Sequence, residues 1–263
     1  MGLVQDAYDR VMTLMTAWGA AAMTVDEKKR AVREHVWALL EEHRAAPAGV
    51  HGRIPAFFGA DEAADRLAEL PEWQSATIVK AVPDTAQQPV RARALDEGKL
   101  VYMAVPKLAE PKPFYLLYPD TLPVSPAEAA DKGAAAKVGQ AVDVDSMRPV
   151  DIIVCGSVAV NRRGVRLGKG AGYSDIEVAL LQEAGLIGPE TTIVTTVHDL
   201  QVTDDDLPET RHDFSVDIIV TPTTVIRCDE PRRPSGLLWD DLPAEKIAAI
   251  PALAARLRQQ SNA

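Results

Sequence analysis

The sequence predicts an α/β protein built on a mostly parallel, doubly wound sheet. Apolar runs with the length of strands alternate along the chain with segments of helical periodicity, which is the pattern of repeated strand–helix–strand units. A glycine-rich loop, residues 166–175, joins the apolar run 151–160 to a helical segment in which Ile176, Leu180 and Leu181 recur at three- to four-residue spacing. The 263 residues suffice for one large domain with a full core.

The composition excludes several classes of protein. The 28 Lys and Arg against 38 Asp and Glu give a formal net charge of −10, which disfavours sequence-independent binding to nucleic acid. Two cysteines are too few for a disulfide scaffold or a zinc site. No apolar run approaches the roughly 20 residues of a membrane helix, and the first residues lack the pattern of a signal peptide. We therefore expect a cytoplasmic protein that binds neither nucleic acid nor a membrane.

An extra helix is predicted at the N-terminus. Residues 3–22 have helical spacing without any group that suggests chemistry. We assign residues 1–23 to a helical extension that is a candidate surface for homo-oligomer formation. Residues 24–263 then form one α/β domain.

The second helix is predicted to begin at a capping box formed by Thr24 and Glu27. Lys29 and Arg33 lie four residues apart on it and project from one face. That face is either the solvated side of the helix or a cationic surface directed at a site.

The remaining elements follow in order. We expect a loop at 45–59 in which Phe57 and Phe58 act as a lid or a core plug, and a long excursion at 110–137 in which Phe114, Tyr115 and Tyr118 line a cleft. We expect helices at 60–70, 88–97 and 244–257 and strands at 77–82, 100–105, 151–160, 191–197 and 216–220.

The glycine loop carries the groups that a polyphosphate and its magnesium ion require. Gly168, Gly170 and Gly172 lack the Cβ atoms that would keep the backbone away from a bound anion, and the following helix N-terminus adds partial positive charge. The loop also contains two cations and, just after them, a carboxylate that is a hard oxygen ligand: Arg166, Lys169 and Asp175. A plain strand-to-helix turn is the simpler alternative. A dinucleotide-binding turn is weaker, because Lys169 would be unusual there.

Carboxylates also follow predicted strands. Asp84 comes just after the strand at 77–82, a position where α/β proteins place functional carboxylates. Two His-Asp pairs occur further along, His198-Asp199 and His212-Asp213. With only five histidines in the chain, a dinuclear metal hydrolase is disfavoured.

These motifs together resemble the 5-formyltetrahydrofolate cyclo-ligases, also called methenyltetrahydrofolate synthetases. Residues 164–175 read Gly-x-Arg-Leu-Gly-x-Gly-x-Gly-Tyr-x-Asp, which resembles the signature loop of that family. Further matches in family order are Lys29-x-x-x-Arg33, Gly98-Lys99, Gln201-Val202, Leu207-Pro208, His212-Asp213 and Val216-Asp217. The divergent branch of methenyltetrahydrofolate synthetase domain-containing proteins is resembled most, through Gly52-Arg53-Ile54-Pro55, Lys80-Ala81-Val82-Pro83-Asp84 and Val197-His198-Asp199.

The resemblance implies a three-layer α/β/α sandwich and an ATP- and Mg²⁺-dependent enzyme. In that family the γ-phosphoryl group of ATP is transferred to the formyl oxygen of 5-formyltetrahydrofolate. N10 of the same substrate then attacks the activated carbon, which gives 5,10-methenyltetrahydrofolate. Because the nucleophiles belong to the substrate, the protein supplies positioning and neutralisation of phosphate charge.

The resemblance also assigns roles to residues of this chain. The triphosphate would be held by Lys29, Arg33, Arg166, Gly168, Lys169, Gly170, Gly172 and Tyr173. Within that set, Arg166 and Lys169 would stabilise charge during phosphoryl transfer and would be the catalytic residues. Asp175 and Asp213 would hold Mg²⁺, and Asp84 and Arg33 would contact the substrate.

The chain departs from the family pattern at several positions. Ser174 and Ile176 stand where the family usually has an aromatic and a basic residue, and Asp84 stands where it has a glutamate. The folate-facing segment of the family is not recognisable at 107–120. Two alternatives therefore stay open: the same ATP chemistry on a non-folate amide or carboxylate, and a non-catalytic nucleotide-binding module.

Overall fold

The computed structural model describes residues 23–229, 231–233 and 236–260. The predicted helix at 3–22 lies outside these residues. The helices are α2 Val25–Glu42, α3 Ala60–Ala68, α4 Pro71–Ser75, α5 Gln88–Asp96, α6 Pro126–Ala129, α7 Lys132–Val138, α8 Tyr173–Glu183, α9 Ala244–Ala249 and α10 Pro251–Gln260. The strands are β1 Ile78–Ala81, β2 Leu100–Ala104, β3 Phe114–Leu117, β4 Gln140–Val142, β5 Ile152–Cys155, β6 Ala159–Asn161, β7 Arg166–Leu167, β8 Thr192–Thr196, β9 Val202–Thr203, β10 Ile218–Val220 and β11 Val225–Arg227.

The main sheet has eight strands in the order β11-β10-β8-β5-β1-β2-β3-β4. The strands β10, β8, β5, β1 and β2 are parallel to one another. At the two ends of the sheet, β11 pairs antiparallel with β10, β3 pairs antiparallel with β2, and β4 pairs antiparallel with β3. The chain adds β2 on one side of β1 and later returns to place β5 on the other side. Such a change of direction in an open α/β sheet leaves a crevice at the carboxyl ends of the strands, where ligands bind.

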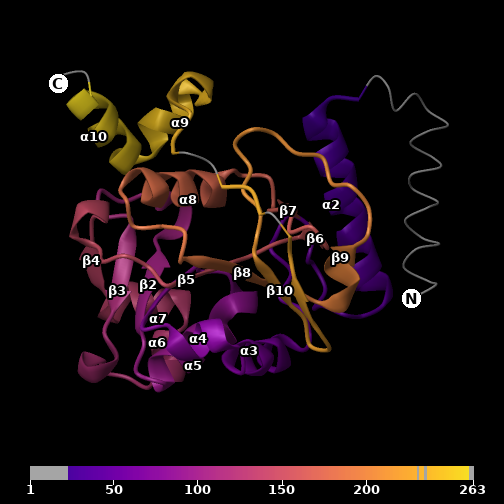
Figure 1. Ribbon diagram of the computed structural model, residues 1–263, viewed down its shortest axis with the longest axis horizontal. Helices are drawn as coiled ribbons and strands as arrows, with labels where there is room; N and C mark the ends of the chain where they lie inside the picture. Colours follow the sequence, from indigo (N-terminus) through magenta and orange to yellow (C-terminus); the bar gives the residue numbers. More distant parts are fainter. Residues whose placement is uncertain (1–22, 230, 234–235, 261–263) are drawn as a thin grey trace.

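Helices cover both faces of this sheet, so the prediction of three layers is confirmed (Figure 1). Alternate residues of β1 show why: Val79 packs into the core beneath α2, α3 and α5, and Ile78 packs into the core beneath α8 and α10. Both faces of the strand are therefore buried, as expected of a parallel strand, although Lys80 places one charge on the α8 side. Within the described residues, none of the helices combines the length and the apolar character that a membrane span requires.

A second, small sheet has the order β7-β6-β9 and lies beside α2 (Figure 1). It corrects the prediction of one strand over 151–160, because the run divides between β5 in the main sheet and β6 in the small one. Gly156 lies at the division, and a Cβ atom there would lie 2.9 Å from Cγ2 of Ile54. The small sheet positions Arg166, the first residue of β7 and of the glycine loop.

Two other predicted segments differ from the structure. The excursion at 110–137 contains β3, α6 and α7, and β3 pairs with β2 through Phe114 and Ala104. The closing helix at 244–257 is two helices, α9 and α10, which separate at Ile250 and Pro251. Proline disfavours helical geometry in the preceding residue, which accounts for the break.

Candidate functional site

A cleft of about 850 Å³ lies where β1 and β2 end. The residues predicted for the site all line it: Lys29, Arg33, Asp84, Arg166, Gly168, Lys169, Gly170, Gly172, Tyr173, Asp175 and Asp213. They come from the segment after β1, from α2, from β7, the start of α8 and the loop between these two, and from the segment before β10. The fold thus brings together groups that are far apart in the sequence.

Helix α2 directs its two predicted cations into this cleft. The capping box at its start is present: Glu27 N donates to Thr24 Oγ1 at 3.3 Å and Thr24 N donates to Glu27 Oε2 at 2.9 Å. From this helix, Lys29 Nζ donates to Asp213 Oδ2 at 2.6 Å, and Arg33 Nε donates to the carbonyl oxygen of Gly168 at 2.6 Å. The two side chains therefore hold other parts of the site, and they are not the solvated side of the helix.

The glycine loop packs closely against the guanidinium groups of Arg166 and Arg33. Arg166 is 3% exposed, donates from Nη2 to the carbonyl of Gly156 at 3.1 Å and packs against the ring of Phe214. A Cβ atom at Gly168 would lie 2.7 Å from Arg166 Nη2, and one at Gly170 would lie 3.3 Å from Arg33 Nη1. Gly170 also has a φ of +100°, which disfavours any other residue. The loop therefore depends on glycine at both positions.

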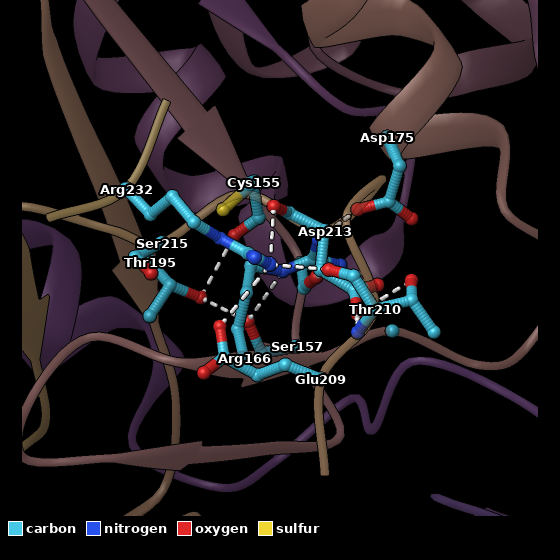
Figure 2. Close-up of polar contacts among 12 residues, drawn as sticks. Cys155, Ser157, Arg166, Asp175, Thr195, Glu209, Thr210, Asp213, Ser215 and Arg232 are labelled. Atoms are coloured by element: carbon cyan, nitrogen blue, oxygen red, sulfur yellow. Dashed lines mark hydrogen bonds and ion pairs between the residues drawn. The ribbon is translucent and has the colours of Figure 1, made fainter. Parts of the chain in front are cut away.

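Two carboxylates lie beside the guanidinium of Arg166 (Figure 2). Asp175 Oδ1 accepts from Arg166 Nη1 at 3.3 Å. Burial raises the pKa of Asp175, Arg166 opposes that rise, and the nearby charge of Asp213 adds to it. For Asp213 burial acts to raise the pKa, but hydrogen bonds from Lys29 and Thr210 outweigh it and the pKa is lowered.

The repulsion between Asp175 and Asp213 is the feature that fits a divalent cation, because a metal ion between two carboxylates stabilises both in the charged form. Among the described residues no group of three or more His, Cys, Asp or Glu side chains could hold a metal ion. Mg²⁺ does not need one, since it is often bound through one or two carboxylates together with phosphate oxygens and water. The pair therefore suits Mg²⁺ that arrives with a phosphate ligand.

The segment around Asp213 is held in place by backbone contacts. Thr210 N donates to Asp213 Oδ2 at 2.5 Å, and Arg232 Nη2 donates to the carbonyl oxygen of Asp213 at 3.0 Å. Arg232 also pairs with Glu209 at 3.2 Å. These contacts fix the carboxylate before any ligand binds.

Asp84 faces the glycine loop from the end of β1. Lys169 Nζ lies 3.4 Å from Asp84 Oδ1. Arg91, fully buried in α5, donates to the carbonyl oxygens of Val82 at 2.5 Å and Asp84 at 3.0 Å, and also to that of Ala130 at 2.9 Å. Burial lowers the pKa of Arg91 to about 10. The Asp84 side of the cleft is thus fixed by a cation that sequence reasoning missed.

Other cleft residues also went unpredicted. They include charged side chains from five segments: Arg53, Lys107, Lys132, Glu177, Asp241 and Lys246. Two of them had a signal in the sequence: Arg53 belongs to the Gly52-Arg53-Ile54-Pro55 motif, and Lys107 lies two residues after the predicted strand at 100–105. The structure gives Lys107 an unusual backbone. Its φ of 61°, next to a φ of 51° at Leu108, places two successive non-glycine residues in the left-handed region at the edge of the cleft.

Several predicted aromatic positions lie elsewhere. The prediction that Phe114, Tyr115 and Tyr118 line the cleft is wrong, because Phe114 is fully buried and the other two lie outside the cleft lining. Phe57 is buried, as a core plug would be, and Phe58 is 58% exposed. The loop at 45–59 instead contributes Arg53 and Ile54 to the cleft.

Comparison with known proteins shows which family this chain resembles in sequence and in fold. The family model described as "5-formyltetrahydrofolate cyclo-ligase family" matches residues 25–222. The NMR structure of Aquifex aeolicus 5,10-methenyltetrahydrofolate synthetase has a similar fold, with a TM-score of 0.50 and 23% sequence identity over 80% of this chain and 96% of that one.

Curated relatives are similar over most of this chain. The methenyltetrahydrofolate synthase domain-containing protein of Mus musculus is 37% identical over 237 residues, which cover 86% of this chain and 62% of that protein. The Homo sapiens protein of that name is 35% identical over 249 residues, 90% of this chain and 63% of that protein. The chain thus spans less than two thirds of their length. The family match over 25–222 shows that this chain belongs to the 5-formyltetrahydrofolate cyclo-ligase family.

Proposed function

We propose that this chain is an ATP- and Mg²⁺-dependent cyclo-ligase that converts 5-formyltetrahydrofolate to 5,10-methenyltetrahydrofolate. The observation that carries the proposal is the convergence in one cleft of a glycine loop, the cations Lys29, Arg33, Arg166 and Lys169, and a pair of repelling carboxylates. A cluster of cations in a chain of net charge −10 suits a triphosphate, which would neutralise it.

Each group has a task in phosphoryl transfer. Arg166 lies buried and locked by Ser157, Gly156 and Asp175, so its charge is preorganised. Lys169 lies next to Asp84, between the glycine loop and the substrate side, where the transferred phosphoryl group would pass. Such fixed charges stabilise the transition state without the cost of reorganisation.

The carboxylates would hold the metal ion. Asp175 and Asp213 would bind Mg²⁺, which neutralises phosphate charge during transfer when it is bound. Lys29 donates to Asp213 Oδ2 and keeps this carboxylate ionised. Asp84, held through its backbone by Arg91, would bind the substrate and orient it toward Lys169.

A second candidate is the same ATP chemistry on a non-folate amide or carboxylate. The observation that favours it is the left-handed turn at Lys107 and Leu108, which shapes the substrate side where the folate-facing segment of the family is not recognisable. A non-catalytic nucleotide-binding module is the third candidate, and it predicts ATP binding without turnover.

The deciding experiment follows the ultraviolet absorbance of the methenyl product with purified protein, 5-formyltetrahydrofolate, Mg²⁺ and ATP. An increase that requires all four components supports the folate assignment. ATP hydrolysis that depends on another amide supports the second candidate. Tight ATP binding with no turnover on either class of substrate supports the third.

Asp175→Asn is expected to weaken the apparent affinity of the enzyme for Mg²⁺ while the fold is retained. The substitution removes a negative charge from the proposed metal site. It should not harm the fold, because burial already disfavours the ionised form of Asp175. Titration of activity against Mg²⁺ should shift to higher concentration by about tenfold or more, the usual scale for loss of a group from a metal site. Asp96→Asn, an exposed carboxylate at the end of α5 and outside the cleft, is the control. An unchanged titration in Asp175→Asn removes this residue from the metal site.

A further inference from the structure

The C-terminal segment, residues 236–260, forms one wall of the cleft. Its lining residues are Gly236, Leu237, Leu238, Asp241, Leu242, Pro243 and Lys246. All of them follow residue 222, where the match to the family model ends. The segment therefore adds to the site something that the family signature does not describe.

This segment is anchored in the core and is not a loose tail. Ile250 and Leu253 are fully buried in the apolar cluster beneath α8. Leu237 N donates to Glu183 Oε2 at 3.3 Å, and Arg256 pairs with Asp145 at 2.8 Å. Figure 1 shows α9 and α10 on the same side of the sheet as α8. These anchors hold the segment against α8 and the core.

One side chain of α9 reaches the glycine loop. Lys246 Nζ donates to the carbonyl oxygen of Ala171 at 2.7 Å. The same ammonium lies 4.0 Å from the centre of the Tyr173 ring, an arrangement that favours a cation. Ala171 lies between Gly170 and Gly172, in the middle of the loop.

The contact of Lys246 has a counterpart at the other end of the loop. Arg33 Nε from α2 holds the carbonyl of Gly168, and Lys246 from α9 holds the carbonyl of Ala171. A trans peptide is planar, so the N–H that follows each carbonyl points to the opposite side. Holding these carbonyls thus turns the N–H groups of Lys169 and Gly172 away from the two cations. Orienting the N–H groups of a loop is how it prepares to bind an anion.

We propose that Lys246 is a positioning residue for the nucleotide. It holds the glycine loop in the conformation in which the loop amides face a phosphate group. The inference rests on the proposed function, because it names the residue that shapes the phosphate-binding loop. Without Lys246 the loop has one restraint fewer, and a glycine-rich backbone loses order readily.

The test compares Lys246→Met, which keeps the aliphatic stem, with Lys246→Arg, which keeps the cation. Glu245→Ala is the matched control, because Glu245 is the exposed neighbour on α9 and does not line the cleft. Lys246→Met should raise KM for ATP about tenfold, the scale of one lost hydrogen bond to a charged group. Its kcat should change by less than about twofold, since the interaction is equal in the ground and transition states. Lys246→Arg should recover most of the loss.

Hydrogen exchange of the protein without nucleotide is the second readout. In Lys246→Met, amides of residues 166–175 should exchange faster while those of β1 and β5 keep their wild-type rates. Wild-type KM and wild-type loop exchange in Lys246→Met would overturn the inference. Faster exchange throughout the sheet together with a lower melting temperature would also overturn it, because Lys246 would then serve stability alone.

The two proposals fail in different ways. If the wild-type protein binds no ATP, the proposed function fails, and the exchange experiment still tests whether Lys246 orders the loop. If the wild-type protein turns over ATP and Lys246→Met behaves identically, the positioning role fails and the proposed function stands.

Discussion

Replacing Lys169 with alanine is expected to remove about 2–4 kcal/mol of transition-state stabilisation, the loss typical of one preorganised donor. This corresponds to a fall in kcat/KM of roughly 30- to 1000-fold. Lys169 Nζ lies 3.4 Å from Asp84 Oδ1, at the point where the glycine loop meets the end of β1. An ammonium there would neutralise the charge that develops as the phosphoryl group leaves ATP.

The measurement is steady-state turnover of ATP with the substrate that supports it, over a range of ATP concentrations. Lys169→Arg keeps the charge and should retain part of the activity, since the planar guanidinium differs in shape from the ammonium. Lys137→Ala, on the outside of α7 and away from the cleft, is the control for a lost surface charge. Turnover that survives Lys169→Ala intact would show that this lysine does not stabilise the transition state.

The second large effect is on stability. Lys80→Met is expected to lower the free energy of unfolding by about 3–5 kcal/mol, because it leaves a buried carboxylate without its partner. Lys80 of β1 is 1% exposed and forms an ion pair with Glu177 of α8, which is 3% exposed. Burial lowers the pKa of Lys80 to about 7, as expected for an ammonium taken out of water.

The double variant separates the pair from its surroundings. Lys80→Met combined with Glu177→Leu removes both charges, and buried ion pairs replaced by apolar side chains often leave stability unchanged or raised by about 1–4 kcal/mol. Urea denaturation of the single and double variants measures the coupling. Arg162→Met breaks an exposed pair with Asp204 and should cost about 1 kcal/mol or less. Equal losses in the single and double variants would contradict the assignment of a coupled pair.

Local signals account for what the sequence could predict. The glycine loop and the Thr24–Glu27 capping box can each be recognised from a few neighbouring residues. Helical spacing placed Lys29 and Arg33 on one face. The alternation of apolar runs with helical segments gave the layered α/β architecture. The predicted phosphate-contacting and metal-binding residues all line the cleft, but their roles, that of Asp213 above all, came from the family resemblance and not from a local pattern.

What escaped prediction depends on contacts between distant segments. The run 151–160 is apolar throughout because β5 and β6 are both buried, so periodicity could not reveal that Gly156 divides them between two sheets. Arg91 and Lys246 lie on helices with no motif, and only the folded chain shows that each holds carbonyl oxygens of a cleft segment. The break before Pro251 did have a sequence signal, since the residue before a proline resists helical geometry.

The two cations that hold the glycine loop come from distant parts of the chain. Arg33 is 135 residues from Gly168, and Lys246 is 75 residues from Ala171. A ribosome adds about 5–20 residues per second, so α2 is made well before the loop and α9 well after it. Long-range contacts of this kind also form slowly, since loop closure must precede them. The glycine loop is therefore among the last parts of this protein to reach its final conformation. A nascent chain that ends before α9 already carries the described strands of both sheets but lacks the Lys246 contact to the loop.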